Sequence, residues 1–212
     1  MQFPDARILL FCRTPQPGKV KTRLIPALGS EAASQLYTRL LRHAVQTVLD
    51  AHLCPLEIWV TPDAKHPFFS EWAELDSVEL FVQSGADLGM RMYNATMDAR
   101  MRAQSVVLIG GDCPLMSAGY LESALTKLQR GYDAVVGPAE DGGYVLLGLR
   151  QCHLTLFEQI NWGAETVCEE TCRRLDDLHW RWSLLEELWD IDRPEDLDRL
   201  AGVPQLSGLV SN

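Results

Sequence analysis

Residues 106–116, VVLIGGDCPLM, decide the fold of this chain. A short apolar run that ends in two glycines predicts a strand buried on both faces, as in a parallel sheet. Asp112 follows at the carboxyl end of that strand, the edge where open α/β sheets bind their ligands. Asp112 therefore either holds a metal ion or caps the next helix. Because Ser117 directly precedes that helix and is the better cap, we favour the metal role.

The rest of the chain alternates apolar strands with amphipathic helices. We expect strands at residues 8–11, 56–61, 78–83, 106–111, 133–139, 143–149 and 180–188. We expect helices at residues 30–51, 88–103, 118–130, 165–178 and 194–202, with Ser30 as the N-cap of the first. This alternation predicts a layered α/β domain with a mostly parallel sheet, and the pair 133–149 predicts an antiparallel element. One domain should cover residues 1–204, followed by a frayed tail over 205–212.

Composition narrows the class of protein. The 212 residues are 47% hydrophobic and 23% charged, which is ordinary for a folded globular domain. The net charge of −10 argues against binding to nucleic acid or to anionic membranes, because both need a basic face. No apolar stretch approaches the roughly 18 residues of a membrane span, and no leader pattern precedes the first strand. Since the six cysteines also lack paired metal-site spacing, we expect a cytoplasmic protein.

A basic loop, residues 12–24 (CRTPQPGKVKTRL), follows the first strand. Its four cations are Arg13, Lys19, Lys21 and Arg23. A proline- and glycine-containing loop at a strand's carboxyl end can turn backbone N–H groups toward an anion, and the cations add charge-assisted hydrogen bonds. The alternative is a solvated surface loop. We favour phosphate binding because this loop and Asp112 share one sheet edge, although neither a Walker loop nor GxGxxG is present.

A second acidic motif, residues 188–197 (LWDIDRPEDL), stands near the end of the chain. Asp190 and Asp192 alternate as strand residues do, so both should point to one side. Asp192 could instead cap the last helix, and taken alone that interpretation is favoured. If Asp192 faces Asp112 across a cleft, the two carboxylates suit Mg²⁺ or Mn²⁺, which complete their shells with water and substrate phosphates.

Two glycine-containing loops are further candidates. In residues 83–92, Gly85 and Gly89 flank a helix start where a flat ligand could approach, or they form an ordinary turn capped by Asp87. In residues 139–144, two acids precede two glycines, which indicates either a tight turn or a ligand site. Trp162 could cover the cleft or fill the core.

With these residues placed, the chain resembles the nucleotide-diphospho-sugar transferase superfamily, which has the glycosyltransferase-A fold. The resemblance covers about residues 6–200 and is closest to a small bacterial glycosyltransferase-like branch related to 2-phospholactate guanylyltransferase. Its motifs occur here in order as FCRTPQPGKVKTRL, LGMRM, GGDCPLM, EDGGYVLLGL and DIDRPEDL. The resemblance implies a three-layer sandwich around a mostly parallel central sheet.

The resemblance also implies roles for particular residues. Asp112 and Asp192 would ligate Mg²⁺ or Mn²⁺, and Asp112, Lys21 and Arg23 would act in catalysis. The nucleotide and its phosphates would contact Arg13, Gly18, Lys19, Lys21, Arg23, Gly85, Leu88 and Gly111. The acceptor pocket would contain Asp141, Gly142, Gly143, Tyr144 and Trp162.

The expected function is metal-dependent transfer from a nucleotide-linked donor to a small-molecule acceptor, with glycosyl transfer as first choice. Nucleotidyl transfer is the alternative, and the absence of GxGxR from the first loop keeps both open. A nucleotide-binding protein that has lost catalysis is a third hypothesis, against which the two retained aspartates argue. A homodimer also stays open.

Overall fold

Seven strands form one sheet in the computed structural model, which describes residues 1–201 and 203. The strand order is β3-β2-β1-β4-β6-β5-β7. Their bounds are β1 Ala6–Arg13, β2 Leu56–Thr61, β3 Val78–Val82, β4 Ser105–Gly110, β5 Ala134–Pro138, β6 Tyr144–Leu149 and β7 Trp182–Leu184. The expected tail over 205–212 lies outside the described residues.

Most strand pairs are parallel, as expected. β1 pairs in parallel with both β2 and β4, β2 with β3, and β5 with β7. Only β6 runs against its neighbours, β4 and β5. The antiparallel element predicted at 133–149 therefore lies inside the sheet, where β6 separates two strands that run the same way.

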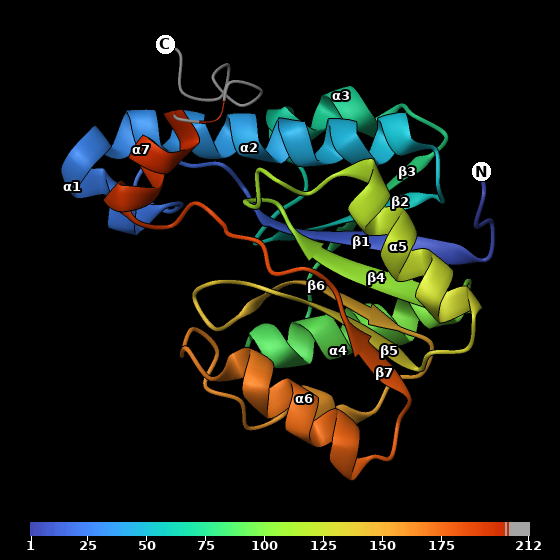
Figure 1. Cartoon of the computed structure of the whole chain (residues 1–212). Helices are drawn as coiled ribbons and strands as arrows, with labels where there is room; N and C mark the ends of the chain where they lie inside the picture. Colours follow the sequence, from blue (N-terminus) through green and yellow to red (C-terminus); the bar gives the residue numbers. More distant parts are fainter. Residues whose placement is uncertain (202, 204–212) are drawn as a thin grey trace.

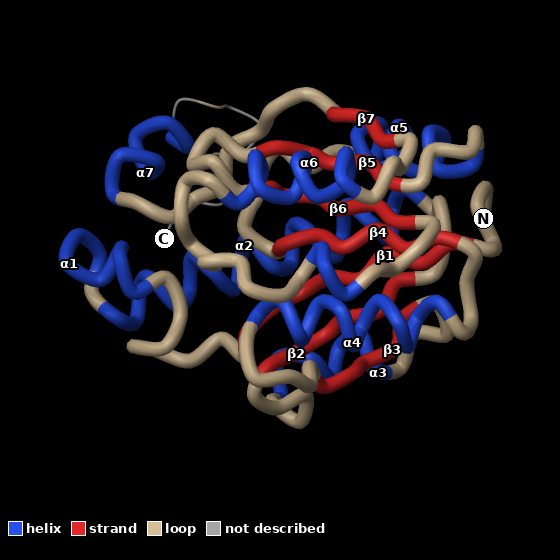
Figure 2. Tube along the Cα trace, turned by 90° about the horizontal axis from the view of Figure 1, so that it is seen from below, coloured by secondary structure: helices blue, strands red, loops and turns tan. Residues whose placement is uncertain are grey.

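Helices cover both faces of this sheet. Figure 1 shows α2, α3 and α5 on one side and α4 and α6 on the other, and Figure 2 views the second side from below. The helices are α1 Ile25–Leu28, α2 Ser30–Ala51, α3 Ser70–Ala73, α4 Leu88–Arg100, α5 Ala118–Gln129, α6 Val167–Asp177 and α7 Pro194–Ala201. None of the helices in the described part of the chain has both the length and the apolar character that a membrane span needs.

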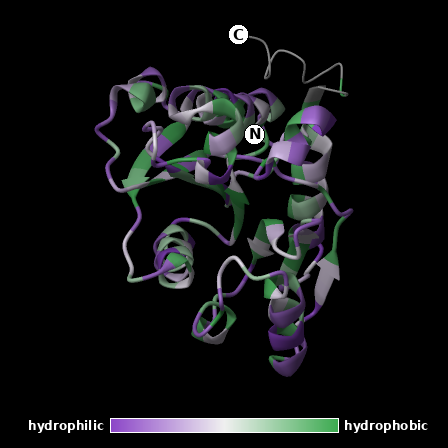
Figure 3. Ribbon diagram, turned by 90° about the vertical axis from the view of Figure 1, so that its left-hand side faces the viewer, coloured by the Kyte–Doolittle hydropathy of each residue, from purple (hydrophilic) through white to green (hydrophobic). Residues whose placement is uncertain are grey.

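Alternating strand residues build two cores. On β1, Ile8 and Leu10 join the core beneath α2 and α5, whereas Leu9 joins the core with α4 and α6. This follows from the two-residue period of a strand, whose side chains point to opposite faces in turn. Figure 3 shows the resulting apolar strands between helices that carry polar residues on their outer sides.

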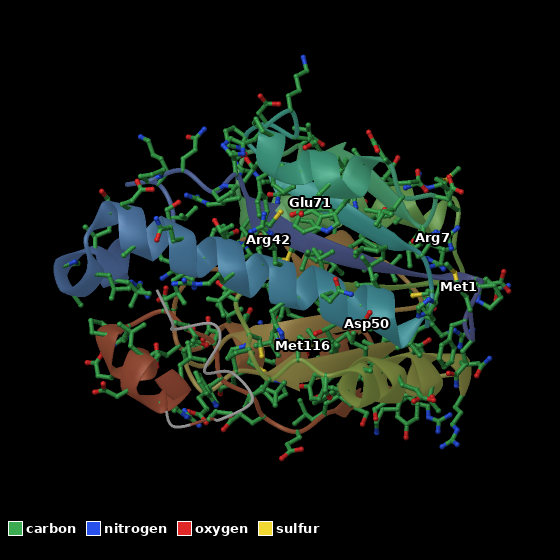
Figure 4. All side chains as sticks on the ribbon, turned by 90° about the horizontal axis from the view of Figure 1, so that it is seen from above. Met1, Arg7, Arg42, Asp50, Glu71 and Met116 are labelled. Atoms are coloured by element: carbon green, nitrogen blue, oxygen red, sulfur yellow. The ribbon has the colours of Figure 1, made fainter. Side chains whose placement is uncertain are left out.

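An exposed ion pair links α2 to α3 on the first face. Arg42 Nε lies 3.1 Å from Glu71 Oε1, and Figure 4 shows the two side chains together. Because both side chains are about half exposed, this pair contributes little to stability. Burial of Phe68 and Trp72 in the core, where their rings meet edge to face at 4.9 Å between centres, contributes more to the stability of α3.

Two local expectations are wrong. Ser30 is the first residue of α2 rather than its N-cap, because α1 ends at Leu28 and Gly29, with a φ of 79°, is the single residue between the two helices and occupies the N-cap position. The strand expected over 180–188 pairs only from Trp182 to Leu184. Residues 186 and 187 then leave the ladder, and pairing resumes in a single bridge between Ala139 and Leu188. Ser117 and Asp87 do cap α5 and α4, as expected.

We predict opposite effects from alanine at two helical glycines. A Cβ at Gly89 would lie 2.1 Å from the Phe157 carbonyl oxygen, so Gly89→Ala should lower the free energy of unfolding by ~1–3 kcal/mol through overpacking. A Cβ at Gly119 on α5 meets nothing within 4 Å, so Gly119→Ala should raise the free energy of unfolding by up to ~1 kcal/mol. Urea unfolding followed by circular dichroism measures both, and a stable Gly89→Ala would contradict this packing.

Candidate functional site

The carboxyl ends of the parallel strands form one edge, on the side where α1 and α7 lie (Figure 1). A cavity of about 570 Å³, here called the first cavity, opens at this edge. It brings together the basic loop, Asp112 and Asp192, which are far apart in the sequence. Its lining also contains Gln83, Leu88, Arg91 and Gly111, and all four predicted cations, Arg13, Lys19, Lys21 and Arg23.

Lys21 lies between the two acidic motifs. Its Nζ is 2.7 Å from Asp112 Oδ2 and 3.9 Å from Asp192 Oδ1, and its side chain is 5% exposed. The backbone of Lys21 is left-handed, at φ 45°, which directs this side chain inward from a tight turn. Burial alone would lower the pKa of the ammonium, but Asp112, Asp190 and Asp192 together outweigh that effect and hold the pKa above its usual value. In this structure Lys21 therefore neutralises the carboxylates.

Asp192 faces the site rather than capping α7. Its carboxylate accepts a hydrogen bond from Arg23, a more exposed side chain. The cap is made by Asp196, whose carboxylate accepts hydrogen bonds from the backbone N–H groups of Asp192 (2.9 Å) and Arg193 (2.6 Å). The interpretation of Asp192 as a helix cap is thus wrong, because Asp196, four residues later, makes the cap.

Asp190 is an acidic site residue that the predicted set omits. Residues 189–192 are not in a strand, but the buried Ile191 donates its N–H to the Asp112 carbonyl at 3.2 Å and fixes the segment beside Asp112. Burial, followed by the charge of Asp112, raises the pKa of Asp190 to about 7. The DID pattern was the available signal, since it places both aspartates in one motif.

Several predicted glycines are explained by packing within the protein. A Cβ at Gly85 would lie 2.7 Å from the Arg91 backbone nitrogen, and one at Gly111 would lie 2.6 Å from Leu41. A Cβ at Gly142 would lie 1.9 Å from the Glu165 carbonyl oxygen. Gly18, with φ 77° and nothing within 4 Å, serves the turn of the basic loop.

The predicted acceptor residues divide between two further cavities. The second cavity, of about 280 Å³, is lined by Asp141, Gly143, Tyr144 and Trp162 and shares Phe11 and Leu88 with the first. Gly142 instead lines a third cavity of about 530 Å³, together with Asp190 and Asp192. The three cavities share lining residues and meet around the acidic side chains.

The donor set fits a hard divalent cation. One ammonium group reaches both Asp112 and Asp192, so the two carboxylates can face a common cation. Carboxylate oxygens are the ligands that Mg²⁺ and Mn²⁺ prefer. Within residues 1–201 and 203, no cluster of three or more His, Cys, Asp or Glu side chains has metal-binding geometry. The remaining ligands would thus be water and phosphate oxygens.

A related crystal structure has the same fold over most of the chain. It is that of a candidate nucleotide-diphospho-sugar transferase from Desulfovibrio desulfuricans G20, with 34% identity, a TM-score of 0.82, and coverage of 90% of this chain and 83% of that one. Residues 44–164 match the family described as "Uncharacterized protein conserved in bacteria (DUF2064)". The chain belongs to this family, within the nucleotide-diphospho-sugar transferase superfamily. The predicted resemblance is confirmed, and the chain is a glycosyltransferase-like or nucleotidyltransferase-like enzyme.

More distant structures share the fold of this superfamily. CMP:2-keto-3-deoxy-manno-octonic acid synthetase complexed with CTP has a TM-score of 0.59 at 11% identity, over 93% of this chain and 97% of that one. Rv0371c from Mycobacterium tuberculosis H37Rv, in complex with manganese, has a TM-score of 0.55 at 15% identity, over 92% of this chain and 97% of that one. No curated protein matches the chain.

We predict that Asp190 makes stability fall as pH rises. Because its pKa is raised from 3.8 to about 7 in the folded state, Asp190 favours folding when protonated, and this contribution is lost between about pH 4 and pH 7. At pH 8 in EDTA, Asp190→Asn should unfold with a free energy roughly 2–4 kcal/mol above wild type, with little difference at pH 4. Urea titrations at both pH values measure this. Asp76→Asn, at an exposed carboxylate, is the control, and equal stability of Asp190→Asn and wild type at pH 8 would contradict the prediction.

Proposed function

We propose that this chain is a metal-dependent glycosyltransferase, which moves a sugar from a nucleotide-diphospho-sugar to a small-molecule acceptor. The observation that carries the proposal is the first cavity, where the cations of the basic loop face Asp112 and Asp192. A diphosphate donor would use both features, the cations to pair with its phosphate oxygens and the carboxylates to hold a divalent ion. The proposed unit is one domain of residues 1–204, with three layers.

In this proposal the basic loop binds and orients the donor. Arg13, Lys19, Lys21 and Arg23 pair with phosphate oxygens, while Leu88 contacts the base and Gly111 forms part of the wall. Gly85 does not line this cavity and serves the tight turn before α4. Lys21 exchanges its partner from Asp112 to phosphate, which frees the carboxylate. Asp112 and Asp192 are the residues that would hold Mg²⁺ or Mn²⁺. When bound, the ion neutralises the charge that builds on the leaving diphosphate.

The chain's other residues place the acceptor against this donor. Asp141, Gly143, Tyr144 and Trp162 form the acceptor side, and Gly142 fixes the turn that carries Asp141. Burial of the reacting groups between the two cavities excludes water and aligns acceptor and donor. Arg23 and Lys21 stabilise the negative charge that grows as the bond to the diphosphate breaks.

Nucleotidyl transfer is the second candidate. The CTP complex of CMP:2-keto-3-deoxy-manno-octonic acid synthetase favours it, because that protein shares this fold and binds a nucleoside triphosphate. In that reaction an acceptor phosphate attacks the α-phosphorus and pyrophosphate leaves. The same cationic loop and carboxylates would serve either donor, so the two candidates differ in the leaving group.

A thermal-shift panel tests this proposal. Nucleotide sugars and nucleoside triphosphates are each added with and without Mn²⁺, at concentrations up to 100 times a dissociation constant, which stabilises the fold by about 2.7 kcal/mol. We expect one nucleotide sugar to raise the melting temperature only with Mn²⁺, and Asp112→Asn to abolish the effect. Asp5→Asn, at an exposed position before β1, is the control and should respond as wild type does.

The other outcomes are equally informative. Stabilisation by a bare triphosphate alone would replace glycosyl by nucleotidyl transfer. An unchanged response in Asp112→Asn, with its far-ultraviolet circular dichroism intact, would remove Asp112 from the metal site. Absence of any nucleotide response in the wild type would contradict the proposed function.

A further inference from the structure

The second cavity differs in chemistry from the first, which it adjoins through Phe11 and Leu88. Its walls come from the end of β4, the start of β6, α4 and the segment before α6. Most of its lining is apolar: Phe11, Leu88, Met92, Leu108, Ile109, Tyr144, Val145, Trp162, Ala164 and Val167. An occupant that covers these side chains must present an apolar surface of its own.

Charge is divided unequally between the two cavities. The first is lined by five cations, Arg13, Lys19, Lys21, Arg23 and Arg91. Among the described residues that line the second, none is a cation, and the one charged side chain is Asp141. A phosphate or carboxylate placed there would lose water, gain no counter-charge and face a carboxylate. The second cavity therefore disfavours anions.

The aromatic wall of this cavity is fixed in place. Trp162 meets Tyr144 edge to face, with 6.4 Å between ring centres and 87° between planes. The indole also lies against α4 at Gly89, where a Cβ would come within 2.7 Å of the indole nitrogen. Because the rings are held from two sides, they offer a preformed surface to a ligand.

One carboxylate oxygen of Asp141 is hydrogen-bonded within the protein, and the other is available to a ligand. Its Oδ1 accepts a hydrogen bond from the Gly143 N–H at 2.8 Å, which fixes the carboxylate at the mouth of the cavity. Gly142, at φ 84°, packs so closely on Glu165 that the turn is anchored to the segment before α6. Within the described residues Oδ2 accepts no hydrogen bond, so it can accept one from a ligand hydroxyl.

We propose that the second cavity binds an acceptor that is uncharged and partly apolar, and that carries a hydroxyl donated to Asp141. This inference rests on the proposed function and names its acceptor class. An acceptor that lacks phosphate cannot attack through a phosphate oxygen, so the reaction at this site is transfer onto a hydroxyl. The charge pattern of the cavities thus disfavours the nucleotidyl transfer described above, in which an acceptor phosphate attacks the α-phosphorus, and accords with glycosyl transfer to a hydroxyl.

The acceptor oxygen forms a bond to the anomeric carbon of the donor, and the bond from that carbon to the diphosphate oxygen breaks. Its electron pair leaves on the nucleoside diphosphate, beside the cations of the first cavity. The hydroxyl proton passes to Asp141 and from there to water.

A matched pair of probes tests the acceptor class. Phenyl β-D-glucopyranoside and its 6-phosphate differ only in the charged group, and binding of each to the full chain is followed by tryptophan fluorescence. Trp162→Phe identifies the signal that comes from the second cavity. We expect the uncharged probe to bind at least about tenfold more tightly, since like charges oppose the phosphate. Asp141→Asn should reduce this preference because it removes the opposing charge.

A second pair of variants keeps the test independent of folding defects. Leu88 is 43% exposed at the boundary of the two cavities, so substitutions there leave the core intact. Leu88→Lys should strengthen binding of the 6-phosphate by about tenfold, whereas Leu88→Gln should not, because only the former adds a counter-charge.

Equal or tighter binding of the phosphorylated probe overturns the proposal, as does absence of a Trp162 signal with both probes. Failure of the proposed function is seen separately, in the absence of nucleotide-sugar binding to the first cavity by thermal shift. If nucleotide sugars bind but the 6-phosphate is preferred, the acceptor class alone is wrong.

Discussion

The parallel pairing of β1 with β4 is the constraint on which the site depends. Its register pairs Phe11 with Gly110, the last residue of β4, and β1 continues to Arg13, which lies level with Asp112 in this register. Arg13, two residues after Phe11, belongs to the basic loop, and Asp112, two residues after Gly110, is the first of the site's carboxylates. Cations and carboxylates that are 91 (Lys21 and Asp112) and 169 (Arg23 and Asp192) residues apart in the sequence thus meet at one sheet edge, where open α/β sheets bind their ligands.

Charge balance at this edge follows from that register. Lys21 satisfies Asp112, and Arg23 satisfies Asp192, so the carboxylates are paired within the protein itself. Partly buried carboxylates need such partners. The same arrangement couples phosphate binding to cation binding. A phosphate that pairs with Lys21 would leave the carboxylate of Asp112 without its partner and so available to a divalent cation. The pKa of Asp190 at the same edge is raised first by burial and then by the charge of Asp112.

Local pattern and motif order predicted most of the sheet and many residues of the first cavity. Periodicity located β2 and β6 within a residue, and the proline–glycine loop marked the basic loop. What failed depends on distant contacts. The Phe157 carbonyl leaves room only for glycine at position 89. The length of β7 is set by the point at which its pairing with β5 stops. Asp190 is buried because the hydrogen bond from Ile191 to Asp112 holds its segment against the site. A residue's spacing in the sequence carries no information about such neighbours, so these roles needed the fold.

The most direct measurement of the central claim is ³¹P nuclear magnetic resonance of the bound donor during titration with Mn²⁺. If Asp112 and Asp192 hold the ion against phosphates gripped by the basic loop, trace Mn²⁺ will broaden both diphosphate resonances of a nucleotide sugar in the presence of wild-type protein well beyond the broadening in free solution. In Asp112→Asn that excess broadening should disappear while the protein stays folded. The same excess broadening with Asp112→Asn as with wild type would contradict the account.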